Sequence, residues 1–233
     1  CVEAHAALAE AAGAELRYAE PANDWWTDGA GVSVVTAAGQ YSAERLVITA
    51  GPWLKRVLKL DLPLQPERVP MFWMQPVVAL DLFSPERFPI WLWDTGDAGL
   101  FYGFPHLEWP GVKLARHHSG NPCDPETVNR EIQPVDEAPI RAFVSRFLPA
   151  LDGPVVHARV CMYTNTPDEH FVVDRHPDLP NVTYAGGFSG HGFKFSTVIG
   201  EILADLSLDG RAMPEADFLS AARFAATAST SSA

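Results

Sequence analysis

The 233-residue sequence predicts an α/β fold combined with an α+β fold. Two observations support this prediction. Near the C-terminal end, an apolar run at 181–187 leads through a glycine-rich loop into a helix with one apolar stripe, which is a strand, loop and helix unit. Between residues 63 and 163, prolines separate short aromatic runs, a pattern typical of an antiparallel sheet with one apolar face.

The first block of elements lies before Pro63. Residues 1–12 are rich in Ala, Leu and Glu and predict a helix, with Gly13 in the position of a C-terminal cap. Three strands are expected next, and a turn at 37–40 joins the second to the third. Their ranges are 15–20, 31–36 and 41–50.

The second block continues to the C-terminus. Strands are expected at 71–78, 89–94, 100–105, 112–118, 155–163 and 171–173. Apolar residues at spacings of three and four predict a helix at 134–148. The last eight residues, ATASTSSA, have nothing to bury and are expected to extend into solvent.

Composition limits the class of partner. The net charge of −12 argues against a nucleic acid or an anionic membrane surface, so a small molecule is favoured. No apolar run reaches the length of about 20 residues that spans a bilayer, and the first residues lack a secretory signal, so a cytoplasmic protein is expected. The cysteines Cys1, Cys123 and Cys161 show no metal-binding spacing, and their odd number suits a reducing compartment.

Three local signals could carry chemistry, and each has a structural alternative. The loop 186–194, GGFSGHGFK, allows close backbone approach to an anionic ligand, but it also suits a tight turn between strand and helix. Alternation in VKLARHH puts Lys113 and His117 on one face, although charges there also suit an exposed edge strand. Cys161, taken alone, indicates a packed core thiol.

Two longer motifs, VCMYTNTPDEHFVVDRHP and YAGGFSGHGFKFSTVIGEIL, resemble the C-terminal half of the monomeric sarcosine oxidase and N-methyltryptophan oxidase family, within the D-amino acid oxidase superfamily. The segments YSAERLVITAGPW, LPLQPER, FYGFP, VKLARHH and DPETVNRE follow in that family's order, so the resemblance extends over most of the chain. Only C-M-Y-T and G-F-S-G-H-G-F-K are specific by themselves.

The resemblance implies oxidation of a small secondary amine such as sarcosine, with hydride transfer to FAD and reduction of O2 to H2O2. It implies that Cys161 joins the flavin covalently, that Lys113 activates oxygen, and that Lys113 and His117 are the catalytic candidates. The positions matched to cofactor contacts are Ala50, Gly51, Gly187, Gly190, His191, Gly192 and Lys194. Those matched to substrate contacts are Tyr102, Tyr163, His191 and Lys194, with Lys194 expected to meet the substrate carboxylate.

The implied domains are part of an FAD-binding domain at 1–62, a substrate domain at 63–166, a return segment of the FAD-binding domain at 167–210 and a C-terminal tail at 211–233. The family's opening strand and G-x-G-x-x-G motif do not occur in this sequence, so a partial dinucleotide fold without its first βαβ unit is expected. Two alternatives follow: a truncated, inactive chain, or an oxidase of N-methyltryptophan or a cyclic imino acid. Trp91 and Trp93 are candidates to narrow the substrate pocket.

Overall fold

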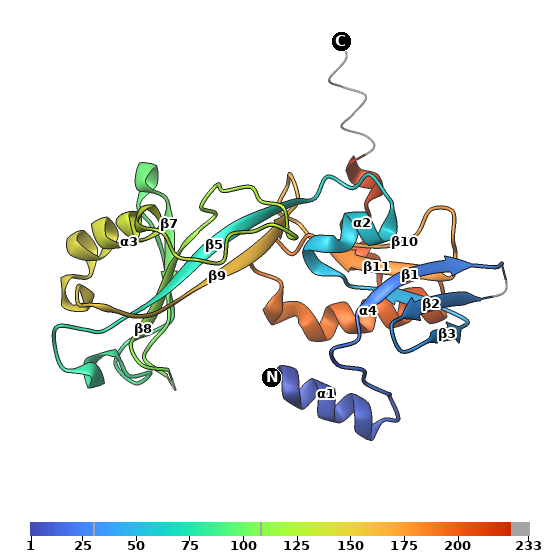
Figure 1. Cartoon of the computed structure of the whole chain (residues 1–233). Helices are drawn as coiled ribbons and strands as arrows, with labels where there is room; N and C mark the ends of the chain where they lie inside the picture. Colours follow the sequence, from blue (N-terminus) through green and yellow to red (C-terminus); the bar gives the residue numbers. More distant parts are fainter. Residues whose placement is uncertain (30, 108, 225–233) are drawn as a thin grey trace, which may run out of the picture.

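The computed structural model describes residues 1–29, 31–107 and 109–224. Figure 1 shows two halves, one containing α3 and the other α4, joined by the long strands β5 and β9. The helices are α1 (Val2–Ala11), α2 (Leu54–Leu58), α3 (Pro134–Phe147) and α4 (Ser196–Leu208). The strands are β1 (Ala22–Thr27), β2 (Val32–Thr36), β3 (Gln40–Ala43), β4 (Leu46–Ile48), β5 (Gln65–Met74), β6 (Trp91–Asp94), β7 (Leu100–Gly103), β8 (Val112–His117), β9 (Val155–Asn165), β10 (Val172–Arg175) and β11 (Val182–Gly186). Short 3-10 turns occur at η1 (Gly51–Trp53), η2 (Leu80–Phe83), η3 (Gly96–Ala98), η4 (Pro149–Leu151), η5 (Phe193–Phe195) and η6 (Pro214–Leu219).

The larger half is a five-stranded antiparallel sheet in the order β6-β7-β8-β5-β9. One face packs against α3, where Phe72 and Leu114 of the sheet meet Ile140, Phe143 and Val144 of the helix. These helix residues recur at spacings of three and four, as the sequence pattern predicts. The expectation of an antiparallel sheet with one apolar face is confirmed.

The smaller half is built round a three-stranded sheet in the order β10-β11-β4, in which β11 runs parallel to β4. Alternating residues of β11 face opposite sides. Tyr184 packs toward Leu54 and Leu58 of α2, while Ala185 packs toward Ile199 of α4. The strand, glycine loop and helix unit predicted near the C-terminal end is therefore present as β11, its loop and α4.

Prolines inside β5 do not break it, and the strand begins six residues earlier than the expected 71–78. Residues 71–74 pair with β8 on one side, whereas Pro66 and Pro70 lie before this stretch and pair with β9 alone. The backbone N–H of Arg68 points away from β9, to the carbonyl of Asn121. Pro66 and Pro70 share this orientation by alternation, so their missing N–H groups remove no bond to β9.

Other expectations for the first block need correction. Residues 15–20 form no strand, and the first strand is β1 at 22–27, whose sequence ANDWWT shows no clear alternation of apolar and polar residues. The expected strand 41–50 divides into β3 and β4 because β3 pairs with β2 while β4 pairs with β11 in another sheet. The turn at 37–40 joins β2 and β3, and the Thr36 N–H donates to the Gly39 carbonyl.

The two ends of the described chain differ in packing. No residue of α1 is buried, and Figure 1 shows the helix apart from both sheets. Leu219 of η6, in contrast, is buried against α4, so the described part of the expected tail is packed. Residues 226–233, expected to extend into solvent, lie outside the described residues. Across the ranges that the structure describes, no helix is both long and apolar enough to cross a membrane.

A buried ion pair connects β5 to α3. The guanidinium of Arg68 donates to both carboxylate oxygens of Asp136, at 2.7 and 2.8 Å, and to the carbonyls of Asn129 and Glu131. The Asp136 carboxylate also accepts from the N–H of Gln133, completing the capping box of α3. Hydrogen bonds from Arg68 keep the pKa of Asp136 below its ordinary value, although burial opposes them.

We expect Asp136→Ala to lower the free energy of unfolding by about 3–5 kcal/mol, because Arg68 then remains buried without its partner. Urea denaturation measures this difference. The matched control is Asp81→Ala, since Asp81 and Arg87 form a pair with side chains 68% and 52% exposed. Loss of such an exposed pair costs about 0–1 kcal/mol. Equal costs for the two variants would contradict the assignment.

The same pair predicts a pH dependence. Because the pKa of Asp136 is lowered in the folded state, its contribution is complete above the unfolded-state pKa. It is lost as the pH falls through the folded-state value. The stability difference between the parent protein and Asp136→Ala should therefore shrink in acid, as urea titrations repeated at decreasing pH would show.

Candidate functional site

Five of the predicted site residues share one face of the large sheet. Lys113 and His117 alternate on β8 with Val112 and Leu114, which are buried on the α3 side. The register therefore directs the side chains of Lys113, His117, Cys161, Tyr163 and Tyr102 to the face opposite α3. Residues from β7, β8 and β9, far apart in the sequence, are brought together there.

A chain of polar groups crosses this face. The Nδ1 atom of His117 lies 3.2 Å from the Tyr163 hydroxyl, which in turn lies 3.5 Å from the hydroxyl of Tyr102. Burial raises the pKa of both Tyr163 and Tyr102, and burial lowers the pKa of His117. At neutral pH the phenols therefore keep their protons and the imidazole is neutral. The Tyr163 hydroxyl donates to Tyr102 and can accept from the Nδ1–H of His117, and the group as a whole can bind polar parts of a ligand.

Lys113 is a half-buried cation between aromatic rings. Its Nζ lies 5.3 Å from the ring centre of Trp73 and 5.2 Å from that of Phe104. Burial lowers the pKa of Lys113, an effect that nearby Cys161 opposes. Within the described ranges no carboxylate lies close enough to pair with it. Lys113 also lines a cavity of about 340 Å³, so its charge is free to act on a ligand.

The glycine loop after β11 packs directly on the end of β9. Gly190 has a φ of +78°, and a Cβ at that position would lie 2.5 Å from the Tyr163 ring. A Cβ on Gly187, where φ is +64°, would lie 2.5 Å from the Thr166 side chain. The buried residue between them, Ser189, donates its N–H to the Thr164 carbonyl at 3.0 Å. Glycine is therefore required here for both space and backbone conformation.

A cavity of about 560 Å³ lies where the two halves meet. Its walls include Gly51 of η1, Tyr163 of β9, the loop residues Gly187, Gly190 and Gly192, and Ser196 and Gly200 of α4. Ala50 instead lines a neighbouring groove of about 720 Å³ beside β4, together with Trp25 and Val47. The cavity unites four of the predicted cofactor contacts, Gly51, Gly187, Gly190 and Gly192, with one of the predicted substrate contacts, Tyr163.

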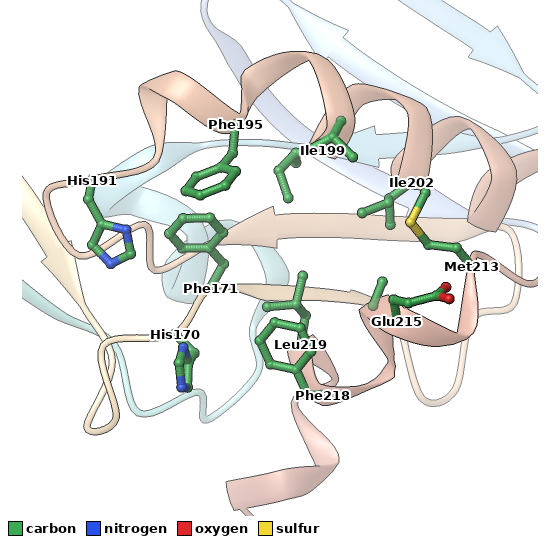
Figure 2. A pocket seen from close by; sticks show the side chains of 12 residues that line it. His170, Phe171, His191, Phe195, Ile199, Ile202, Met213, Glu215, Phe218 and Leu219 are labelled. Atoms are coloured by element: carbon green, nitrogen blue, oxygen red, sulfur yellow. The ribbon is translucent and has the colours of Figure 1, made fainter.

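Two predicted site residues lie elsewhere. His191 packs on Phe171 with ring centres 4.9 Å apart, and it lines a separate cavity of about 240 Å³ between α4 and η6. Figure 2 shows its imidazole at one end of this cavity, with Met213 at the other end. The backbone reverses direction between Phe188 and His191, where the His191 N–H donates to the Phe188 carbonyl, and the His191 Nε2 lies 3.0 Å from the Glu169 carbonyl. Lys194 is exposed, with its Nζ 5.4 Å from the Phe195 ring centre. Among the described residues neither side chain makes a hydrogen bond or ring contact with Lys113, His117 or Tyr163, although His191 lies near enough to His117 to lower the pKa of that imidazole.

Tryptophan orientation also differs from expectation. Trp91 stacks on Phe143 of α3 with ring centres 5.5 Å apart, and Trp93 lies 5.3 Å from Phe147 of the same helix. Both therefore belong to the apolar face and do not narrow a pocket on the opposite face. Their strand, β6, pairs with β7 in a register that places Trp93 across from buried Phe101.

Sequence reasoning missed a cluster around Glu67. This glutamate lies on β5 directly across from Tyr163, and its carboxylate accepts a hydrogen bond from Asn165 of β9. His118, next to His117, lies 3.4 Å from the same carboxylate. A glutamate inside an otherwise largely apolar strand, and two adjacent histidines, were signals that could have drawn attention to it.

Comparison with known proteins finds relatives that match most of the chain. The family profile described as FAD dependent oxidoreductase matches residues 1–206. A monomeric sarcosine oxidase of Streptomyces avermitilis is 45% identical over 213 residues, covering 90% of this chain and 56% of that protein. An N-methyl-L-tryptophan oxidase of Salmonella heidelberg is 34% identical over 86% of this chain and 53% of that protein. The solved structure of NikD, described as an unusual amino acid oxidase essential for nikkomycin biosynthesis, has a TM-score of 0.75 at 25% identity and covers 92% of this chain and 57% of that one. The chain thus spans about half the length of the curated relatives it matches.

We expect Gly190→Ala to disturb the site, because the added methyl would meet the Tyr163 ring and alanine disfavours the positive φ. The stability loss should exceed about 1 kcal/mol, measured by urea denaturation, and the Tyr163 ring resonances should shift in NMR spectra. Gly200→Ala on α4 is the control, since a Cβ there meets nothing within 4 Å. That variant should be neutral or stabilised by up to about 1 kcal/mol. A Gly190→Ala protein as stable as Gly200→Ala would refute the close contact.

Proposed function

Since this chain belongs to the FAD dependent oxidoreductase family, we propose that it forms the catalytic face of an oxidase of small secondary amines, such as sarcosine or another N-methyl amino acid. The proposed products are the substrate imine and, from O2, H2O2. The observation that supports this proposal is the presence of Lys113, His117, Cys161 and Tyr163 on one sheet face at the positions that resemble the family's site residues. In this proposal residues 63–166 bind substrate, and residues 1–62 and 167–210 contribute to binding of FAD.

The residues of the 560 Å³ cavity fit a flavin. Four glycines, Gly51, Gly187, Gly190 and Gly192, contribute no side chain to its wall, and the aromatic and aliphatic groups of Tyr163, Phe188 and Ile199 beside them suit a planar ring system. When bound, FAD supplies the chemistry of accepting a hydride and delivering electrons to O2. Gly51, another lining residue, has a positive φ of +53°, and a Cβ there would meet nothing within 4 Å.

Cys161 is the proposed covalent attachment point for FAD. Its thiol is half-buried and unpaired, and β9 directs it to the same side as Tyr163, two residues further along the strand. A thiolate is the nucleophilic form of cysteine, and Cys161 lies close enough to Lys113 to oppose the lowering of that lysine's pKa. These features support an anchoring role over the packed core thiol that the local pattern alone indicated.

Lys113 is the proposed oxygen-activating residue. Negative charge develops on oxygen as it accepts electrons, and a fixed ammonium close by stabilises that charge. The aromatic walls formed by Trp73 and Phe104 limit competing solvation. The lack of a carboxylate partner in the described part of the chain means that no counter-ion reduces the effect.

The polar chain of His117, Tyr163 and Tyr102 is the proposed substrate contact. A neutral imidazole can accept a proton from a substrate ammonium, and the Tyr102 hydroxyl can donate to a substrate carboxylate. The pKa of His117 is lowered by burial and by His118, which favours the proton-accepting form at neutral pH. His191 and Lys194 match the family's positions in the sequence. For their side chains to contact a substrate bound by His117, Tyr163 and Tyr102, the glycine loop must turn toward these three residues.

A second candidate is a chain that does not retain FAD or turn over by itself. The observation that favours it is the edge of β4, which pairs with β11 on one side only within the described residues. Val47 on this strand is 44% exposed beside the 720 Å³ groove. A sheet edge of this kind is normally covered in a dinucleotide fold. Flavin content and H2O2 release on sarcosine distinguish the two candidates.

We expect protein supplied with FAD to keep its flavin after acid precipitation, and Cys161→Ser to release it. Absorbance of the pellet and supernatant measures retention. Cys123→Ser is the matched control, because Cys123 lies in the loop after β8 and not beside Tyr163 on β9, so retention should match the parent protein. Equal retention of flavin by Cys161→Ser would refute the covalent link. Parent protein that contains no flavin would favour the inactive candidate.

We expect Lys113→Met to slow reoxidation of the reduced flavin by about 100- to 1,000-fold, the scale of losing one fixed electrostatic group. Anaerobic reduction by substrate should change far less. Stopped-flow absorbance measures the two half-reactions separately. Lys55→Met is the control, since Lys55 pairs with Asp61 at the surface. A parallel loss in both half-reactions would argue that Lys113 serves substrate binding and not oxygen.

A further inference from the structure

Glu67 is an unusual buried carboxylate. It is 4% exposed, and in the described part of the chain its one ion-pair contact is to His118, with no lysine or arginine beside it. Burying an ionised carboxylate costs several kcal/mol unless hydrogen bonds compensate. The residue lies on the same face of β5 as the candidate site, directly across from Tyr163.

Four donors compensate this burial. The carboxylate accepts from the Gly120 N–H at 2.9 Å, the Ser119 hydroxyl at 3.0 Å, His118 Nδ1 at 3.4 Å and Asn165 Nδ2 at 2.5 Å. Burial acts to raise the pKa of Glu67, but these bonds outweigh it and the pKa is lowered. The group is therefore an anion at neutral pH, and it connects two separate segments of the chain.

The first segment is the turn that follows β8. Three consecutive residues, His118, Ser119 and Gly120, all donate to Glu67, and His118 has a φ of +51°. A left-handed conformation is unfavourable for histidine and persists only where surrounding contacts determine it. The carboxylate supplies those contacts. It thereby fixes the backbone directly after His117.

The second segment is the end of β9. Asn165 donates to Glu67 and lies two residues after Tyr163 on the same face of the strand. The closest polar contact of the candidate site joins His117 Nδ1 to the Tyr163 hydroxyl, at 3.2 Å. On β8 the residue after His117 binds the Glu67 carboxylate, and on β9 the residue two positions after Tyr163 binds the same carboxylate. The His118 ring also contacts both partners, at 4.1 Å from His117 and 5.6 Å from Tyr163 between ring centres.

We propose that Glu67 is a positioning residue: by binding the turn 118–120 and Asn165 at once, its carboxylate fixes the His117 imidazole against the Tyr163 hydroxyl. Among the described residues Glu67 makes no hydrogen bond to either partner of that bond, and it positions them through the turn and Asn165. The consequence for substrate binding rests on the proposed function. The alignment of His117 with Tyr163 does not depend on the proposed function, because both residues belong to this chain and their hydrogen bond needs no ligand.

The test measures the coupling between Glu67 and Tyr163 through the pKa of His117. That pKa is obtained from an NMR titration of the protein with labelled histidine. The charged and titratable groups that face His117 are His118, Glu169, His191, Glu67, Tyr163 and Tyr102. The Tyr163 hydroxyl donates to Tyr102 and so accepts from the Nδ1–H of His117, which favours the protonated imidazole; Tyr163→Phe should therefore lower the pKa of His117. In a Glu67→Gln background that downward shift should fall to less than about half, because the partners are no longer aligned.

Glu137→Gln is the matched control, since it makes the same change in charge on α3, across the sheet from the site. The Tyr163→Phe shift should be the same in Glu137→Gln as in the parent. An undiminished shift in Glu67→Gln would overturn the proposal, because a residue with a purely stabilising role leaves the coupling unchanged.

Ser119→Ala covers the case in which Glu67→Gln fails to fold. It removes one donor to Glu67 and leaves the charge in place; the Ser119 hydroxyl also lies 2.8 Å from the Arg68 carbonyl, so its single hydrogen is shared between the two acceptors. The coupling should then decrease in the same direction by a smaller amount, and full coupling would overturn the proposal. Where FAD-loaded protein turns over, Glu67→Gln should also lower kcat/KM by roughly 10- to 100-fold, the usual effect of misplaced catalytic groups. Absence of flavin would remove only this last measurement, so failure of the proposed function and failure of this inference are separable.

Discussion

The pairing of β5 with β9 is the constraint on which the other parts depend. The register runs from Gln65 and Asn165 at one end to Met74 and Val155 at the other, and it links the two halves of the molecule. Consecutive residues of β5 carry opposite charges to opposite faces. Arg68 binds the start of α3, while Glu67 binds the turn after β8 and the end of β9. If β5 slipped by one residue against β9, Arg68 and Glu67 would exchange faces, and each buried charge would lose its partners. The two residues therefore specify the register of the strands as well as the positions of the neighbouring loops.

The candidate site exists because β9 extends past the large sheet into the smaller half. Tyr163 belongs to the sheet, but the residues that follow it meet the glycine loop, where Ser189 binds the Thr164 carbonyl and Gly190 lies against the Tyr163 ring. One strand thus contributes to the polar chain on the sheet and to the wall of the cavity between the halves. The glycines permit this approach, and the approach in turn limits how far the loop can move from Tyr163.

Elements with strong periodicity were predictable from the sequence. The helix α3 and the strand, loop and helix unit at β11 and α4 appear where apolar spacing places them, and alternation in β8 orients Lys113 and His117 correctly. Features that depend on long-range pairing were not predictable. The polar strand β1, the division between β3 and β4, and the direction of Trp91 all follow from which partner a segment finds, information that no local window contains. Glu67 belongs to the same class, since its four donors come from residues 51 to 98 positions away.

The electrostatic arrangement follows from this architecture. A protein of net charge −12 repels anions at long range, so a zwitterionic or cationic amine reaches the site more easily than a free acid. Within the site the local charge is positive. Lys113 has no carboxylate partner among the described residues, whereas the negative charge of Glu67 is enclosed by its own donors. Neutral His117 and the protonated phenols lie between these two charges. A carboxylate that binds four protein donors has little capacity left to attract a substrate ammonium, so Glu67 can fix the geometry of the site without competing for the ligand.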